Sequence, residues 1–348
     1  MALDERKFLI LRAIIDDYIT TAVPVGSRTV SRKSGVGFSP ATIRNEMSDL
    51  EELGYLASPH TSAGRIHSAK AYRLYVDRLL KVGELSREEA EFMQSHLNAR
   101  TAQVDSVLKA AAQALSNVTQ YTALVAGPSV STLKIKRVQL VQVDDTTALM
   151  VVVTSAGIVK DTLIRVPEGL NPDLLHNLSE TITRALADQP LSEIRQIFAE
   201  VFRDLRENRK LFAGVMNALE TRLQDEEKNQ VVVGGPGNLL HYPEYADVNR
   251  ARDFLSVLES RDKLYPLLRS GSSMEFSIRI GPETGVPELS DCSVVTATYR
   301  VDDQTTGTLG IVGPTRMHYG HVIAALGYMG RLLTKVLSNE DAQPKMGE

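Results

Sequence analysis

The chain has 348 residues, a net charge of -4 at pH 7, 43% hydrophobic residues and a single cysteine. One hydrophobic core rarely serves a chain of this length, so we expect more than one domain. The lone Cys292 excludes an intramolecular disulfide and a thiolate metal cluster. No apolar run is long enough to span a bilayer and the first residues lack a signal-peptide pattern, so we expect a cytoplasmic protein without a membrane segment.

Positive charge gathers near the N-terminus although the whole chain is acidic. Residues 1–82 carry twelve Lys and Arg against nine Asp and Glu. Within them, residues 24–45 and 60–76 contain no acidic side chain. A DNA backbone attracts positive potential concentrated on one face, and acidic residues elsewhere do not prevent this. The N-terminal charge pattern therefore favours a nucleic-acid interface.

Two helices are predicted at the start of the chain. Apolar residues at helical spacing predict a first helix over residues 3–19. A brief second helix is expected over residues 28–34, with Ser27 as its N-cap and Gly35 after its last turn.

A third helix and a hairpin are predicted next. Ser39 stands where an N-cap belongs and Pro40 occupies the first helical position, where its missing N–H costs nothing. Gly54 is expected to end this helix. Two short strands around a small-residue loop, within residues 55–66, predict a wing, so residues 1–82 are interpreted as a winged helix-turn-helix.

The third helix has one apolar side and one polar side. Its apolar side is formed by Ile43, Met47, Leu50 and Leu53. The other side carries the candidate base-reading residues Thr42, Arg44, Asn45 and Ser48. Arginine can bind guanine and asparagine can bind adenine through two hydrogen bonds each. Contacts to the DNA backbone, in part from the wing, are expected from Ser27, Arg28, Ser39, Arg65, His67 and Lys70.

A three-helix unit with a hairpin could also serve protein contacts. A surface that faces proteins normally intersperses both signs of charge. Because the acid-free stretches coincide with the predicted reading helix and wing, the pattern favours DNA.

The remainder of the chain is predicted to form an α+β domain interrupted by a helical insertion. Residues 83–119 form a helical connector, and β-rich segments follow up to residue 164. Residues 171–227 are almost wholly helical, after which strand-like segments return. We therefore expect one α+β domain in two pieces, residues 120–170 and residues 228–340. A helical insertion, residues 171–227, separates the two pieces, and residues 341–348 form a short tail.

A long apolar stripe runs through the predicted insertion. It includes Phe198, Val201, Leu205, Phe212, Met216 and Leu219. Such a stripe needs a partner surface. Packing onto the chain's own sheet and dimerisation through these helices both satisfy that need.

The sequence contains no constellation for catalysis. The segment Gly-Gly-Pro-Gly-Asn at residues 234–238 lacks the Gly-Lys-Ser/Thr of a phosphate loop, and its proline removes an N–H. The seven histidines show no pair at ligand spacing. We therefore expect neither an enzyme nor a metal site, and no cofactor.

Several motifs together resemble one family. They are Val-Gly-Ser-Arg-Thr-Val at residues 25–30, Ser-Pro-Ala-Thr-Ile-Arg-Asn-Glu-Met at 39–47, Leu-Glu-Glu-Leu-Gly-Tyr-Leu at 50–56, His-Thr-Ser-Ala-Gly-Arg at 60–65, and Gly-Ile-Val-Gly-Pro-Thr-Arg-Met-His-Tyr at 310–319. They closely resemble the heat-inducible transcription repressor HrcA family.

This resemblance implies both an architecture and a mechanism. Members of that family combine a winged helix, a GAF-like domain and an inserted dimerisation domain. They bind an inverted-repeat DNA operator ahead of chaperone genes as homodimers, and the chaperonin keeps them active. The expected function is therefore negative regulation of heat-shock transcription in a stress response.

Two other functions stay open at this point. A GAF-like domain could hold a small ligand, which would make the protein a metabolite-responsive regulator. An enzyme with the winged helix as an accessory is a third possibility, and the missing acid/base pair argues against it.

Overall fold

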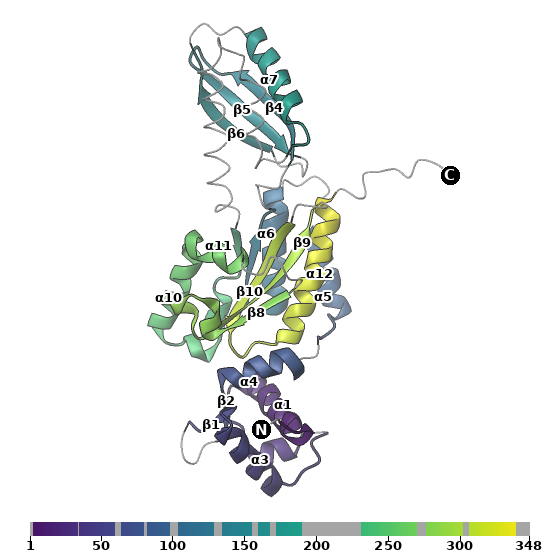
Figure 1. Cartoon of the computed structure of the whole chain (residues 1–348), viewed down its shortest axis with the longest axis vertical. Coiled ribbons are helices and arrows are strands. Elements are labelled where there is room, and N and C mark those ends of the chain that lie inside the picture. Colours follow the sequence, from purple (N-terminus) through teal and green to yellow (C-terminus); the bar gives the residue numbers. More distant parts are fainter. Residues whose placement is uncertain are drawn as a thin grey trace, which may run out of the picture.

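The structure is a computed structural model that describes residues 3–33, 35–59, 64–79, 82–97, 104–128, 134–154, 159–167, 172–189, 231–269, 276–301 and 306–338. Its elements form three units along the long axis of the molecule (Figure 1). N-terminal helices lie at one end, a five-stranded sheet with flanking helices lies in the middle, and a three-stranded sheet with a helix lies at the other end. Helices and antiparallel sheets confirm the expected α+β class.

The N-terminal unit has three helices and then a hairpin, as the sequence predicted. The helices are α1 (Glu5–Thr21), α2 (Ser27–Ser31) and α3 (Pro40–Glu52), and the antiparallel strands are β1 (Leu56–Ala57) and β2 (Ile66–His67). Helix α4 (Ala69–Leu74) follows and continues into the π-helical turn η1 (Tyr75–Leu79). The core of this unit is fully buried and includes Ile10, Leu11, Ile14, Ile15, Ile43 and Leu50.

The ends of α1 and α3 follow from local hydrogen bonding. The Asp4 carboxylate accepts a hydrogen bond from the backbone N–H of Lys7 at 2.8 Å, which caps α1. The Ser39 hydroxyl accepts one from the backbone N–H of Thr42 at 3.1 Å, so the predicted cap of α3 is confirmed. Gly54 follows α3 with a φ of +75°, a left-handed conformation that favours glycine.

The predicted cap of α2 is wrong. Gly26 is the N-cap residue and makes no side-chain cap bond, whereas Ser27 is already the first helical residue. The physical reason lies in the hairpin. Val25 forms an antiparallel bridge with Arg65, the extended Gly26 follows as the N-cap, and the helix begins at Ser27.

A five-stranded antiparallel sheet forms the centre of the molecule. Its strand order is β7-β3-β10-β9-β8. The strands are β3 (Thr122–Ala126), β7 (Val231–Gly234), β8 (Phe276–Ile280), β9 (Cys292–Arg300) and β10 (Thr306–Pro314). The sequence predicted a strand near each of these positions.

Alternate side chains of this sheet pack against two different layers of helices. The layer on one side consists of α5 (Arg87–Leu97), α6 (Val104–Thr119) and α12 (Tyr319–Leu337). The sheet residues in its core include Val125, Val295 and Ile311. The layer on the other side consists of α10 (Val248–Glu259) and α11 (Arg261–Arg269). Its core takes up Leu124, Val294 and Val312.

Helices α10 and α11 were not predicted. Pro266 stands inside α11, and a proline is a strong signal against a helix interior. The surrounding chain also contains short 3-10 helices, which are η4 (Asn238–His241), η5 (Pro243–Tyr245), η6 (Gly281–Thr284) and η7 (Pro287–Leu289).

The third unit has a sheet of its own. Strands β4 (Ile135–Gln142), β5 (Thr147–Thr154) and β6 (Val159–Arg165) pair in that order, and α7 (Pro172–Leu186) packs on β4. The Thr183 hydroxyl donates to the carbonyl of Val138 at 2.9 Å, and the Ser179 hydroxyl accepts from the backbone N–H of Leu140 at 2.9 Å. These bonds fix the helix on the strand.

The expectation that residues 120–170 lie in one unit with the C-terminal strands is therefore wrong. Only β3 joins the central sheet, whereas β4, β5 and β6 form the separate sheet. An alternating apolar pattern shows that a strand buries one face, and does not show which layer covers that face. Here the cover is α7, whose buried residues are Leu175, Leu178 and Ile182.

Two sets of predictions lie outside the described residues. One is the continuation of the helical insertion beyond α7, with the candidate dimerisation residues Phe198, Val201, Leu205, Phe212, Met216 and Leu219. The other is the tip of the hairpin, at residues 60–63.

Candidate nucleic-acid interface

Helix α3 presents three of the candidate base-reading residues on its exposed side. Arg44, Asn45 and Ser48 are exposed, and none of their side chains has a hydrogen bond or ion pair with another described residue. The opposite side packs into the core through Ile43, Met47 and Leu50. A rigid helix with a free polar face can donate hydrogen bonds to base edges.

Thr42 and Ser39 are placed at the start of the same helix. The two hydroxyl groups lie 2.9 Å apart, and Ser39 also caps the helix. Thr42 is half-buried, whereas Ser39 is exposed. These hydroxyls therefore organise the N-terminus of α3, where free backbone N–H groups favour phosphate.

An ion-pair cluster that the sequence analysis missed fixes α3 to α1. The Glu46 carboxylate is buried and pairs with Lys7 Nζ at 2.7 Å and Arg6 Nη1 at 3.3 Å. Lys7 Nζ also lies 2.9 Å from Asp49 Oδ2. The hydrogen bond to Glu46 is the main reason why the pKa of Lys7 is raised. The sequence did contain a signal for this buried carboxylate, because Glu46 follows Ile43 by three residues and therefore lies on the inward side of the helix.

The hairpin residue Arg65 is already bound within the chain. Its Nη2 lies 2.7 Å from Glu51 Oε2 of α3, and its Nη1 donates to the Ser58 hydroxyl at 2.9 Å. Its backbone exchanges two hydrogen bonds with Val25, each of 2.9 Å. A Cβ at the preceding Gly64 would lie 2.5 Å from the Val25 carbonyl carbon, so only glycine fits there. Arg65 therefore fastens the hairpin to α3 rather than pointing freely outward.

The structure does not favour the predicted backbone contact from His67. Its ring lies between Tyr18, at a centroid distance of 4.6 Å, and Tyr72, at 3.8 Å. Both ring nitrogens are buried without a hydrogen-bond partner, and burial lowers the pKa of His67 to about 4. A neutral, inward-facing imidazole cannot hold a phosphate. The alternation of a two-residue strand was too short to reveal this orientation.

The other candidates for backbone contacts are more accessible. Lys70 is exposed, and its Nζ donates to the carbonyl of Leu53 at 3.0 Å while lying 4.4 Å from the ring centroid of Tyr55. It thereby neutralises the C-terminal end of α3. Arg28 in α2 is exposed, and the neighbouring Ser27 is half-buried.

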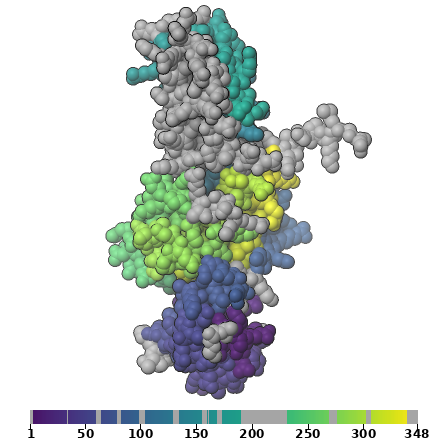
Figure 2. All heavy atoms as spheres, viewed as in Figure 1, coloured from purple at the N-terminus to yellow at the C-terminus, as the bar shows by residue number. Residues whose placement is uncertain are grey.

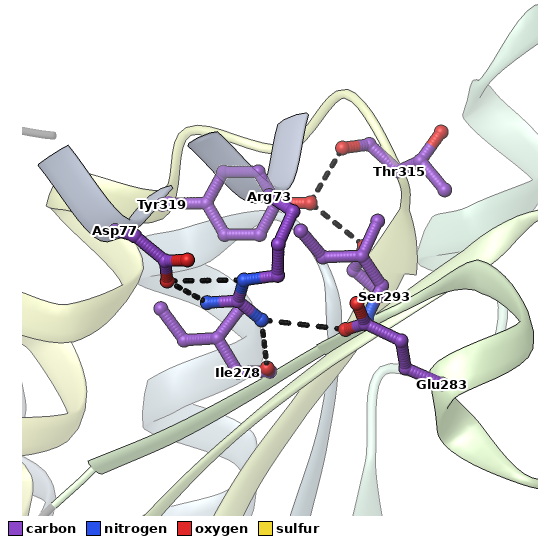
Figure 3. Close-up of polar contacts among 8 residues, drawn as sticks. Arg73, Asp77, Ile278, Glu283, Ser293, Thr315 and Tyr319 are labelled. Carbon is purple, nitrogen blue, oxygen red and sulfur yellow. Dashed lines mark hydrogen bonds and ion pairs between the residues drawn. The ribbon is translucent and has the colours of Figure 1, made fainter. Parts of the chain in front are cut away.

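Arg73 of α4 joins the N-terminal unit to the edge strand β8, as Figure 3 shows. Its Nη1 donates to the carbonyl of Ile278 at 2.8 Å and lies 3.3 Å from Glu283 Oε2. Its Nε and Nη2 donate to Asp77 at 3.0 and 2.5 Å. The acceptors belong to both units, so this planar guanidinium bridges them.

Arg316 makes a second bridge between the same two units. It forms a bidentate ion pair with Glu244 and donates from Nη1 to the carbonyl of Ile19 at 3.1 Å. Ile19 lies in the last turn of α1, where carbonyls lack helical partners. The Arg316 side chain is only 9% exposed. Figure 2 shows the N-terminal unit as a lobe at one end of the molecule, and these two arginines help to hold it on the central unit.

Two kinds of feature are absent among the described residues. No helix among them is long and apolar enough to cross a membrane. They also contain no group of three or more His, Cys, Asp or Glu side chains arranged to hold a metal ion.

Comparisons with known proteins cover nearly the whole chain. The sequence model of the HrcA protein C-terminal domain matches residues 105–323. A relative from Acetivibrio thermocellus is 41% identical over 332 residues, which are 94% of this chain and 95% of that protein. One from Pelotomaculum thermopropionicum is 40% identical over 339 residues, 97% of each chain. Both are named heat-inducible transcription repressor HrcA.

A solved structure described as a hypothetical protein supports the same fold. It superimposes with a TM-score of 0.65 at 25% identity, covering 97% of this chain and 99% of that one. Together these findings define the class of protein: the chain is a negative regulator of the transcription of heat-shock genes. It belongs to the HrcA family.

Proposed function

We propose that the N-terminal unit is a winged helix-turn-helix and that α3 reads an inverted-repeat operator in the major groove. The observation that carries this proposal is the exposed side of α3, where Arg44, Asn45 and Ser48 have no partner among the described residues. The inward side of the same helix is fixed by apolar packing and by Glu46. A rigid helix that displays free polar groups is what direct readout of bases requires.

The residues divide into readers and supports in this proposal. Arg44 binds guanine and Asn45 binds adenine, each contact being worth about 1 to 3 kcal/mol of discrimination. Ser39 and Arg28 contact phosphates beside α3. Arg65 sets the position of the hairpin through Glu51, and contributes to affinity mainly through its charge.

The central unit is the GAF-like domain of this proposal, and the third unit begins the inserted dimerisation domain. The side of the three-stranded sheet away from α7 carries several exposed apolar side chains. Its exposed side chains include Val141, Val159 and Leu163, which are 48%, 60% and 63% exposed. Val141 and Leu163 both pair with Leu149 of β5, so they form one row across the sheet. A row of exposed apolar side chains of this kind supports association through the insertion, as in a homodimer.

Heat control is proposed to act through the chaperonin. The relatives are named heat-inducible repressors, and the resemblance implies that the chaperonin maintains their active form. In the bacterial cytoplasm, heat-unfolded substrates would then occupy the chaperonin, leave the repressor inactive and release the chaperone genes. If purified repressor kept full operator affinity through repeated heating, with and without chaperonin, this feedback would be excluded.

The primary test is fluorescence-anisotropy binding to an inverted-repeat duplex and to the same duplex with one half-site scrambled, across a salt series. We expect tight binding only when both half-sites are intact. Equal and weak binding to both duplexes, by protein with a cooperative thermal unfolding transition, would contradict the proposed function.

A second candidate function is a regulator that responds to a small metabolite through the GAF-like domain. A groove beside α12 in that domain favours it.

A further inference from the structure

The central unit contains a groove of about 1180 Å³ beside α12. One wall is the exposed edge of the sheet, with Phe276 and Ile278 of β8, and the other is a side of α12 that includes Gly327. Ala297 and Tyr299 of β9 form part of its lining between the two. Pockets that bind small organic molecules usually measure about 300 to 1000 Å³, so the space is ample.

Gly327 lets the Phe276 ring lie close against α12 at the side of this groove. It stands in the middle of α12, where glycine costs roughly 1 kcal/mol relative to alanine. A Cβ there would lie 3.4 Å from Phe276 Cζ, which is an ordinary contact. An alanine would therefore fit and favour the helix, whereas a longer side chain would displace the Phe276 ring and the Arg331 guanidinium that line the groove.

Two arginines give the groove its charge. Arg300 of β9 and Arg331 of α12 line it, are exposed, and have no ion-pair partner among the described residues. The Arg331 guanidinium lies over Tyr328 at 5.9 Å from the ring centroid. Glu84 is the one carboxylate among the described lining residues, so the lining is cationic on balance.

We propose that this groove binds an amphipathic organic anion, with an apolar body along Phe276, Ile278 and Gly327 and an acidic head on Arg300 and Arg331. An apolar space flanked by unpaired guanidinium groups complements a carboxylate on a hydrocarbon chain better than a neutral or cationic ligand.

The groove also touches the connection to the N-terminal unit. Val76 of η1 and residues 82–85 line it, and the Ile278 carbonyl accepts the hydrogen bond from Arg73. A bound ligand would therefore contact both units at the joint. This step rests on the proposed DNA-binding function, and predicts that ligand binding changes operator affinity.

The test is calorimetric titration of the full-length protein with dodecanoate, and with dodecanol as the neutral counterpart. We expect dodecanoate to bind and dodecanol to bind about tenfold more weakly. The Arg331→Ala variant should lose about tenfold in dodecanoate affinity and leave dodecanol unchanged. Arg252→Ala, an exposed arginine of α10 on the other side of the sheet, is the matched control and should change neither.

The groove itself is tested with a pair of glycine variants. Gly327→Leu should abolish binding of both ligands, whereas Gly327→Ala should keep binding, and thermal unfolding checks that both variants fold. Equal affinity for dodecanoate and dodecanol would overturn the anion assignment. Absence of binding by either ligand would overturn the proposal. If Gly327→Leu also made the protein dissociate in sedimentation, a second copy of the chain would be what covers the groove.

Operator binding is measured separately, with and without saturating dodecanoate. A changed operator affinity supports the coupling between groove and joint, and an unchanged one overturns that coupling. Because calorimetry needs no DNA, failure of the DNA-binding proposal cannot be mistaken for failure of the ligand site.

Discussion

The first turns of α3, and the segment that runs from the β1–β2 hairpin into α4, both carry basic or polar side chains in acid-free parts of the sequence, yet these side chains have different surroundings. Those of Arg44 and Asn45 are exposed and without partners among the described residues. Those of Arg65, His67 and Lys70 contact the chain itself, through Glu51, two tyrosine rings and the Leu53 carbonyl. Residue type alone therefore does not separate a reader of DNA from a support of the fold.

Removing the proposed base-reading side chains of α3 is the strongest test of this difference between α3 and the hairpin. Arg44→Ala and Asn45→Ala should each lower specific operator affinity by about 1 to 3 kcal/mol, or roughly 5- to 150-fold. Non-specific binding should keep most of its affinity, and thermal stability should stay unchanged because neither side chain has an internal bond. Anisotropy with operator and random duplexes measures this, with Arg252→Ala as control. If specific and non-specific affinity fell equally, α3 would not be the reading helix.

The buried state of His67 predicts a pH effect on stability. Its pKa is about 4 in the folded chain and about 6.5 when unfolded, so the unfolded state takes up the proton first. Stability from this residue is complete above pH 6.5 and is lost as pH falls towards 4. Between pH 7 and pH 5 the loss should be about 2 kcal/mol.

Urea unfolding at both pH values measures the His67 effect. His67→Phe keeps an aromatic ring between Tyr18 and Tyr72 and cannot titrate, so it should lose about 2 kcal/mol less than the wild type on acidification. Identical losses in the two proteins would place the imidazole in solvent, and would restore His67 as a candidate phosphate contact.

The ion pair between Arg65 and Glu51 can be removed. Glu51→Gln removes the carboxylate 2.7 Å from the guanidinium and leaves the shape of the side chain. Arg65 should then be free to contact phosphate, which raises affinity for all sequences by a few-fold and steepens the slope of log K against log salt by about one. The double variant Glu51→Gln, Arg65→Gln should return to a lower slope. An unchanged salt slope in the single variant would mean that Arg65 is too distant from DNA.

Lys70 should show the smallest effect. Lys70→Gln removes a cation from the C-terminal end of α3, which is worth about 0.3 to 1 kcal/mol of stability. Binding to operator and random DNA should weaken equally and slightly, since a lysine contact to phosphate carries no sequence information. A loss restricted to the operator would contradict this and assign Lys70 a base contact.

The joint between the units depended on residues far apart in the chain. Arg73 reaches Ile278 and Arg316 reaches Ile19, and no local pattern marks such pairs. The same applies to Lys7 and Glu46, although the inward spacing of Glu46 gave a usable hint. Local periodicity describes one element at a time, so contacts between elements are outside its reach.

The sequence by itself determined the helices of the N-terminal unit, the Ser39 cap, the turn at Gly54 and the polar side of α3, because capping bonds and helical periodicity act within a few residues. It also determined where most strands lie. Only the tertiary structure decided that β4, β5 and β6 leave the central sheet, that His67 turns inward and that Arg65 binds Glu51. Which surface covers a strand face, or which charge meets an arginine, depends on elements distant in sequence, so these choices are made by packing rather than by local pattern.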